Sequence, residues 1–140
     1  MTRIDFYVLA DTSNEQRYIF ACRLAQKASK QGHRVYIHTE SAEQSQILDD
    51  LLWSFSPTSF VPHTAVANEC KNNPVYINHS GDPLDIHDVV INLSSQTPDC
   101  FARFERLAEL VNQDNDIKVA GRERFKFYNS RGYPLHTHKM

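Results

Sequence analysis

Residues 4–39 read IDFYVLADTSNEQRYIFACRLAQKASKQGHRVYIHT, and this stretch decides the fold. Its first seven residues form an apolar run rich in aromatic and branched side chains, which is typical of a buried strand. Capping residues at positions 11–14 predict the start of a helix, and Gly32 stands where a helix C-terminal glycine belongs. Residues 34–39 predict a second strand, so the whole stretch predicts a right-handed βαβ unit.

The same alternation continues downstream. Ser41, followed three residues later by Gln44, fits a capping box at the start of a second helix. Residues 74–78 and 88–93 resemble two further buried strands. Residues 115–130 predict a last helix, so strands and helices alternate along most of the chain.

This order of elements predicts a three-layer α/β/α fold, in which a mostly parallel, Rossmann-like sheet carries helices on both faces. The length of 140 residues and the hydrophobic fraction of 41% fit a single domain spanning residues 1–140. Residues 99–111 allow two interpretations. They form one helix, or a short helix ending near Phe104 and then a strand over residues 106–111.

A nucleotide-binding enzyme is the first hypothesis for such a sheet, because its ligands usually bind at the carboxyl ends of the strands. The first strand is followed by ADTSN at residues 10–14, which contains no glycine and no lysine. Neither GxGxxG nor GxxxxGK[ST] occurs, and no two of the four glycines are close together. The sequence therefore predicts no phosphate-binding loop, no cofactor and no catalytic residues.

Cysteine and hydropathy patterns exclude other classes. Cys22, Cys70 and Cys100 are odd in number and widely spaced, which argues against a disulfide framework and against a zinc site. The histidines show no metal-ligand spacing either. No apolar run approaches the roughly eighteen residues of a membrane span, and Asp5 interrupts the place of a signal-peptide core. We therefore expect a cytoplasmic protein without a metal.

The charge is distributed unevenly. Residues 118–140 carry six Lys or Arg side chains and one acidic side chain, a net charge of +5. Residues 1–117 carry nine basic and sixteen acidic side chains, a net charge of −7. Such a split suggests a localised anionic partner, and the negative body would repel the long phosphate backbone of duplex DNA.

The predicted last helix holds the basic residues in one stripe. Lys118, Arg122 and Lys126 are spaced by four and share a helix face, with Phe125 on its edge. The missing side chain at Gly121 would leave a shallow depression beside them. Cations next to an apolar groove suit a ligand that carries both acids and a terminal hydrophobic residue.

Two alternatives stay open on these residues alone. The stripe could be an ordinary solvated face of the helix. It could also bind a single-stranded nucleic acid, with the four aromatic residues of this region stacking on bases: Phe125, Phe127, Tyr128 and Tyr133. Against the second alternative, we expect Phe127 and Tyr128 to face the core.

Several segments together resemble a known family. They are FYVL at 6–9, LLW at 51–53, SFVPH at 59–63, DVVINLS at 88–94, RERFKFY at 122–128 and GYPL at 132–135. In this order they are similar to the chi subunit of bacterial DNA polymerase III. The resemblance implies an α/β fold without nucleotide hydrolysis and a place in the clamp-loader assembly. It further implies pairing with the psi subunit and binding of the acidic, phenylalanine-terminated tail of single-stranded-DNA-binding protein.

The resemblance also implies two sites. The tail site falls on Lys118, Arg122, Phe125 and Lys126, with Val111 and Ile117 lining its pocket. The psi contact falls on Trp53, Phe60, Val61, Pro62 and His63. Phe125 stands where a tyrosine is familiar in the family, so stacking would survive but a hydroxyl hydrogen bond would be lost. The expected function is that of a non-catalytic adaptor, with weak or absent direct DNA binding.

Overall fold

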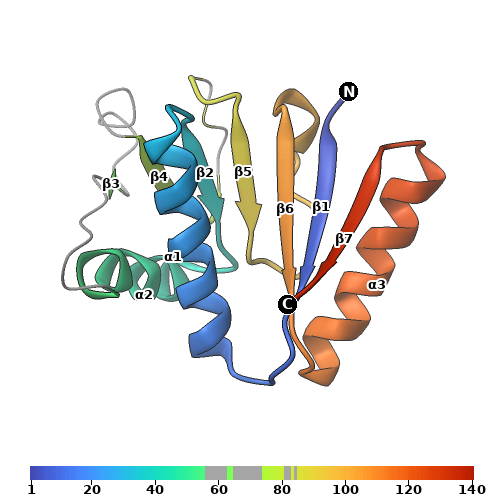
Figure 1. Cartoon of the computed structure of the whole chain (residues 1–140), viewed down its shortest axis with the longest axis horizontal. Coiled ribbons are helices and arrows are strands. Elements are labelled where there is room, and N and C mark those ends of the chain that lie inside the picture. The colour runs from blue at the N-terminus through green and yellow to red at the C-terminus, as the bar shows by residue number, and fades with distance from the viewer. Residues whose placement is uncertain (56–62, 65–73, 81–82, 84) are drawn as a thin grey trace.

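The computed structural model describes residues 1–55, 63–64, 74–80, 83 and 85–140 (Figure 1). Within these residues, seven strands form one sheet in the order β3–β4–β2–β5–β6–β1–β7, and every pairing is parallel. The strands are β1 (Arg3–Val8), β2 (Val35–His38), β3 (His63–Thr64), β4 (Val75–Asn78), β5 (Val89–Asn92), β6 (Arg106–Val111) and β7 (Leu135–Lys139). The helices are α1 (Asn14–Lys30), α2 (Ala42–Ser54) and α3 (Asn115–Ser130), with a short 3₁₀ helix, η2 (Phe101–Arg103).

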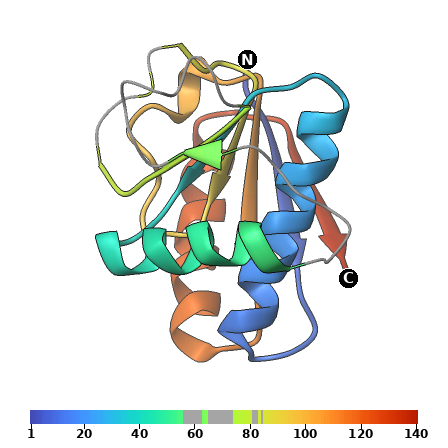
Figure 2. The same ribbon diagram turned by 90° about the vertical axis from the view of Figure 1, so that its left-hand side faces the viewer.

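Two hydrophobic cores lie on opposite faces of the sheet, and Figure 2 shows α1 and α3 on opposite sides of it. On the first face, Ile37 and Ile91 pack with Cys22 of α1 and Leu48 of α2. On the second face, side chains of β1, β2, β5 and β6 pack with Tyr128 of α3 and with the aromatic residues around η2. The predicted three-layer α/β/α fold with a mostly parallel sheet is therefore confirmed.

The capping residues begin the first two helices where the sequence predicts. The Ser13 hydroxyl caps α1 by accepting the Gln16 N–H at 3.2 Å, and Ser41 caps α2 by accepting the Gln44 N–H at 3.2 Å. The Gln44 side-chain oxygen in turn accepts a hydrogen bond of 2.7 Å from the N–H of Glu40, one residue before the cap. Both predicted helix starts are thus satisfied by side-chain acceptors.

The last helix has the bounds that the sequence predicts. The Asp114 carboxylate caps it by accepting the N–H groups of Asp116 at 3.1 Å and Ile117 at 3.3 Å. The helix ends at Ser130 with Arg131 as its C-cap, and Gly132 follows with a φ of +79°, in the left-handed region that favours glycine.

The structure decides between the two interpretations of residues 99–111. The only helical piece there is η2, and Phe104 is already extended with a ψ of 151°. Strand β6 follows and pairs with β5 on one side and β1 on the other. Because five of its six residues are buried from both faces, this segment shows no periodicity that distinguishes a strand from a helix.

Three features were not predicted, of which the first is the two-residue strand β3. Strand β7 was missed because its sequence, LHTHK, contains no apolar run; it is defined by its pairing with β1. The sequence predicts the first βαβ unit but does not indicate that its two strands are not neighbours. In the sheet, β6 and β5 lie between β1 and β2. This order places β1, β6 and β7 together under α3.

Candidate functional site

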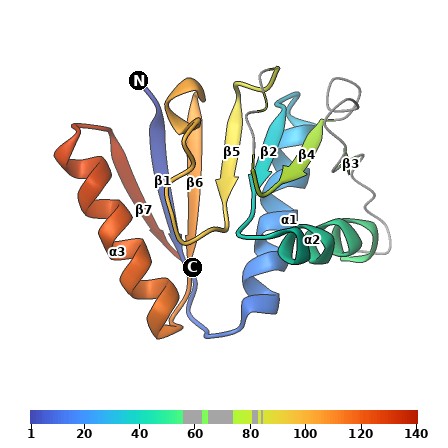
Figure 3. The same ribbon diagram turned by 180° about the vertical axis from the view of Figure 1, so that it is seen from behind.

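The predicted basic helix covers a small cavity at the β7 end of the sheet. Figure 3 shows α3 running beside β7, at the opposite end of the sheet from α2 and β3. The cavity has a volume of about 190 Å³. Eight residues line it: Phe6, Val8, Val111, Lys118, Gly121, Arg122, Phe125 and Thr137. Four of the six residues assigned to the tail site thus surround one space.

The walls of this α3 cavity are apolar. The sheet contributes Phe6 and Val8 from β1, Val111 from β6 and the Thr137 side chain from β7. The ring of Phe125 meets that of Phe6 edge to face, with centroids 5.2 Å apart and planes at 62°. Phe125 is nevertheless 36% exposed, so one part of its ring is held in place while another part remains available to a ligand.

Gly121 explains how close the helix lies to the sheet. A Cβ atom at this position would stand 2.8 Å from Cγ2 of Val111, which is closer than real side chains approach. The glycine therefore allows α3 to pack tightly on β6, besides lining the cavity as the sequence suggests.

The rim of the cavity is positively charged. Lys118 and Arg122 both line it, and neither forms an ion pair with another residue in the described part of the chain. Lys126 lies further out, where its amino group stands 3.8 Å from the carboxylate of Glu123, and both side chains are exposed. Such an exposed pair contributes little stability, so Lys126 remains able to meet an anion.

Ile117 takes a different place from the one expected. It packs against the second core and lines a neighbouring cavity of about 210 Å³ near the start of α1, together with Tyr18 and Arg17. The sequence did not indicate that Phe6, Val8 and Thr137 line the α3 cavity. The first two lie in a predicted strand, and their alternation signals one common face, but nothing local indicates which helix covers that face.

Two of the residues assigned to psi binding, Trp53 and His63, lie at the other end of the sheet. Trp53, at the end of α2, is 60% exposed, and its ring meets the His63 ring edge to face at 5.2 Å. His63 Nε2 stands 3.1 Å from the Asp49 carboxylate of α2. All three residues line a cavity of about 440 Å³. Phe60, Val61 and Pro62 lie outside the described residues.

Comparison with known proteins decides the family. The family described as "DNA polymerase III chi subunit, HolC" matches residues 1–136. This chain belongs to the chi subunit family.

Three relatives, each a DNA polymerase III subunit chi, align with this chain over 80% to 98% of their own length. The one from Pseudomonas aeruginosa is 41% identical over 140 residues, covering 100% of this chain and 98% of the relative. The Haemophilus influenzae subunit is 31% identical over 137 residues, covering 96% and 95%. The Escherichia coli subunit is 29% identical over 126 residues, covering 83% and 80%. The chi subunit is a non-catalytic accessory subunit of the polymerase, so the prediction of a replication protein that is not an enzyme is confirmed.

In this chi-family chain, a buried acid anchors α3 to the sheet. Glu109 of β6 is fully buried and accepts hydrogen bonds from Arg124 Nε at 3.0 Å and from the Tyr128 hydroxyl at 2.6 Å. The Asn92 amide donates to it at 3.0 Å. Burial, and then the charge and hydrogen bond of Glu109, raise the pKa of Tyr128, so its hydroxyl stays a donor. This network fixes the rotation of α3 about its axis and hence the direction of Arg122 and Phe125.

One expectation about this helix is wrong. Tyr128 is fully buried as expected, but Phe127 is 37% exposed. Its ring lies 5.1 Å from the Arg131 guanidinium and against the edge of Phe101. Because the helix turns by about 100° per residue, two adjacent residues cannot both face the core centre.

An arginine occupies the place where nucleotide enzymes bind phosphate. The buried Arg17 of α1 donates from Nε to the Leu110 carbonyl and from Nη2 to the Leu93 carbonyl, both at 2.9 Å. Arg17 thus links the carboxyl ends of β6 and β5. In related sheets, this crevice usually holds a ligand, whereas here it holds a side chain that stabilises the fold.

The described residues contain neither a metal-binding cluster nor a membrane-spanning helix. There, no group of three or more His, Cys, Asp or Glu side chains is placed to hold an ion. Burial raises the pKa of the Cys22 thiol to about 12, which leaves it unreactive. None of the described helices is both long and apolar enough to cross a membrane.

Proposed function

We propose that this chain is an adaptor that binds the psi subunit through the Trp53 surface and an acidic protein tail through the α3 cavity. The tail is that of single-stranded-DNA-binding protein, so the adaptor links the clamp loader to coated single-stranded DNA in the cytoplasm. Neither contact needs a cofactor. The observation that carries the proposal is a ring-sized apolar cavity beneath two cations that have no ion-pair partner among the described residues.

The geometry suits the end of an acidic peptide. A terminal aromatic ring would enter between Phe6, Val111 and Phe125, where it removes apolar surface from water. Arg122 can hold the terminal carboxylate bidentately, while Lys118 meets an upstream acid. Lys126 extends the same charge outward along the helix.

Binding of single-stranded nucleic acid is the less favoured alternative. Stacking would require open aromatic faces, but Tyr128 is fully buried, and Tyr133 packs on the rings of Phe101 and Tyr128. Only Phe125 and Phe127 of the four aromatic residues are exposed. The net charge of −7 on residues 1–117 further disfavours a long polyanion.

Fluorescence anisotropy with a labelled acidic peptide that ends in Pro-Phe tests the tail site. We expect binding in the micromolar range, about −8 kcal/mol. Arg122→Gln should weaken it about thirtyfold, or by about 2 kcal/mol, because a charge-assisted bond to the carboxylate is lost.

Arg23→Gln provides the matched control, since Arg23 is an exposed arginine on α1, across the sheet. If Arg122→Gln and Arg23→Gln bind the peptide equally well, the site is misassigned. Tight binding of a single-stranded oligonucleotide by the parent chain alone would favour the nucleic-acid alternative instead.

A further inference from the structure

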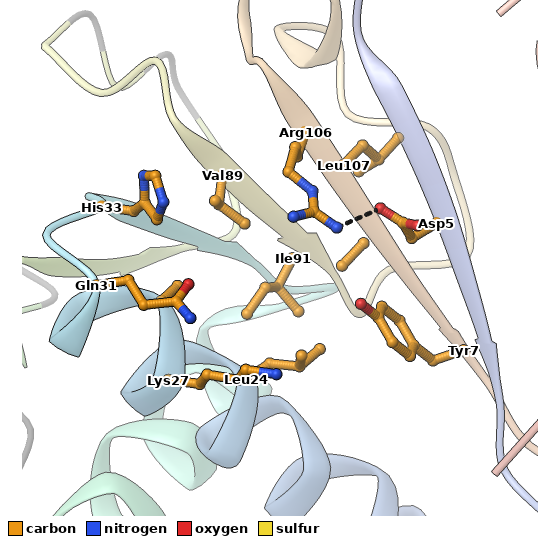
Figure 4. Close-up of a pocket in the computed structure, with 12 residues that line it drawn as sticks. Asp5, Tyr7, Leu24, Lys27, Gln31, His33, Val89, Ile91, Arg106 and Leu107 are labelled. Atoms are coloured by element: carbon orange, nitrogen blue, oxygen red, sulfur yellow. Dashed lines mark hydrogen bonds and ion pairs between the residues drawn. The ribbon is translucent and has the colours of Figure 1, made fainter. Parts of the chain in front are cut away.

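A second small cavity lies on the face of the sheet opposite α3, between α1 and strands β5, β6 and β1 (Figure 4). Its volume is about 200 Å³. Its apolar lining comes from Leu24 of α1, Val89 and Ile91 of β5, and Ala108 of β6. These side chains form a surface against which a ring or a short aliphatic group can pack.

Several side chains that line the cavity carry hydrogen-bond donors. Three of them are the guanidinium of Arg106, the amino group of Lys27 and the hydroxyl of Tyr7. Figure 4 shows Arg106 and Tyr7 on the same side of the cavity, with the Tyr7 hydroxyl directed toward Ile91. Lys27 forms no ion pair with another residue in the described segments. Each of the three groups can donate to an anion.

The carboxylate of Asp5, which also lines the cavity, is already held by hydrogen bonds. Asp5 is only 1% exposed, and its Oδ2 accepts from Arg106 Nη2 at 2.9 Å. Its Oδ1 accepts from Arg3 Nη2 at 3.2 Å and is 2.9 Å from His138 Nε2. Burial by itself would raise the pKa of Asp5, but the hydrogen bonds of His138 and Arg106 and the charges of Arg106 and Arg3 outweigh it, so the pKa lies below its ordinary value.

Asp5 therefore stays ionised and orients Arg106 from behind. Among the residues that line the cavity, the two positive charges of Arg106 and Lys27 against the one negative charge of Asp5 leave a net charge of +1. Burial, and then the charge of Asp5, raise the pKa of Tyr7, so its hydroxyl remains a donor at neutral pH.

We propose that this cavity binds a compact organic anion, a carboxylate or a phosphate attached to an apolar or aromatic body. The apolar part packs on Leu24 and Ile91, and the anionic group is held by Arg106 and Lys27. This site is independent of the proposed function. Alternate residues of β1 separate the two cavities, since Phe6 and Val8 line the α3 cavity while Asp5 and Tyr7 line this one.

Titration of the ¹⁵N-labelled chain, followed by amide NMR, tests the site with three probes of similar size. N-acetyl-phenylalanine offers a carboxylate, phenyl phosphate offers a phosphate, and N-acetyl-phenylalaninamide is neutral. We expect saturable shifts at Ala28 and Ala108 with at least one of the anions and not with the amide. Whichever anion binds more tightly shows whether the site prefers a carboxylate or a phosphate.

Two variants on α1 serve as a matched pair. Lys27→Met keeps an apolar stem at an exposed position and should weaken the anion about fivefold, because one charge contact is lost. Lys30→Met changes an exposed lysine of the same helix that does not line the cavity, and should leave binding unchanged. Arg106→Lys keeps the charge beside Asp5 and should also weaken binding, since the planar fork is lost.

Arg122→Gln separates this site from the α3 cavity, because it should leave the shifts at Ala28 and Ala108 as they are in the parent. The proposal is overturned if neither anion gives saturable shifts there. It is equally overturned if the neutral amide gives the same shifts or if Lys27→Met binds like the parent.

Discussion

At the scale of single residues, Gly121 and Val111 determine how α3 meets the sheet. Gly121→Ala places a Cβ 2.8 Å from Val111 Cγ2 and should destabilise the fold by about 1–3 kcal/mol, the usual cost of overpacking. The same change should weaken binding of the acidic peptide to the α3 cavity, because the helix must move away from the sheet. Urea unfolding and anisotropy measure the two effects.

Val111→Ala supplies the control for that prediction. It removes both Cγ atoms that the new Cβ would meet, so Gly121→Ala should cost less stability in the Val111→Ala background. Equal costs in the two backgrounds would show that the contact is not the cause.

Asp5 gives a second prediction, on the dependence of stability on pH. Its pKa in the folded chain lies below the unfolded value, so its hydrogen bonds stabilise the fold above the unfolded pKa. This stabilisation is lost as the pH falls from about 4, the ordinary value for aspartate, through the lower folded value. The parent should therefore exceed Asp5→Asn in free energy of unfolding at pH 7, and the gap should narrow below that range.

Asp50→Asn is the control, since Asp50 is exposed on α2. Its difference from the parent should stay small at every pH. A gap for Asp5→Asn that is constant from pH 7 down to pH 3 would contradict the assigned role of the carboxylate.

At the scale of elements, the Glu109 network holds α3 against β6. Glu109→Gln removes the negative charge beside the buried Arg124 and should destabilise the fold by about 3–5 kcal/mol. Thermal and urea unfolding measure this, with the exposed Glu105→Gln as the matched control. Adding Arg124→Met should recover part of the loss, and a double variant no more stable than the single one would argue against a charge effect.

How far the sequence predicts these elements depends on whether their cause is local. The approximate bounds of helix α3 could be predicted, because Asp114 and Gly132 act within one turn of its ends. Strand β7 could not, because its polar residues are ordered by pairing with β1, more than 130 positions earlier. The same reason applies to the cavity wall, where the basic rim lies on one helix but Phe6, Val8 and Thr137 meet it only through the strand order.

At the scale of the whole molecule, the two proposed protein contacts lie at opposite edges of the sheet. The Trp53 surface adjoins β3, and the α3 cavity adjoins β7, with five strands between them. At the usual spacing of neighbouring strands, this separates the two edges by about 30 Å, beyond the Debye length of about 8 Å in physiological salt. Neither site should change the affinity of the other.

We therefore expect that psi binding and peptide binding can each be lost without the other. Trp53→Ala should reduce capture of psi and leave peptide binding intact, while Arg122→Gln should do the reverse. Ile47→Ala, which removes another exposed apolar side chain from α2, is the control for psi capture. Added salt should weaken the peptide and have less effect on psi, because only the first contact is dominated by charge. Loss of both partners in either single variant would contradict independent sites.

The position of β1 between β6 and β7 has a consequence for how the protein is made. β1 is the first strand to leave the ribosome, yet both of its neighbours, β6 and β7, come from the second half of the chain. Strands β2, β4 and β5 can pair with one another earlier, so the half of the sheet that carries Trp53 is completed first. The α3 cavity needs Thr137 of β7 and can form only after that strand has been made. A nascent chain would thus fold the half of the sheet beside Trp53 before it forms the α3 cavity, so the two proposed contacts would become available in that order.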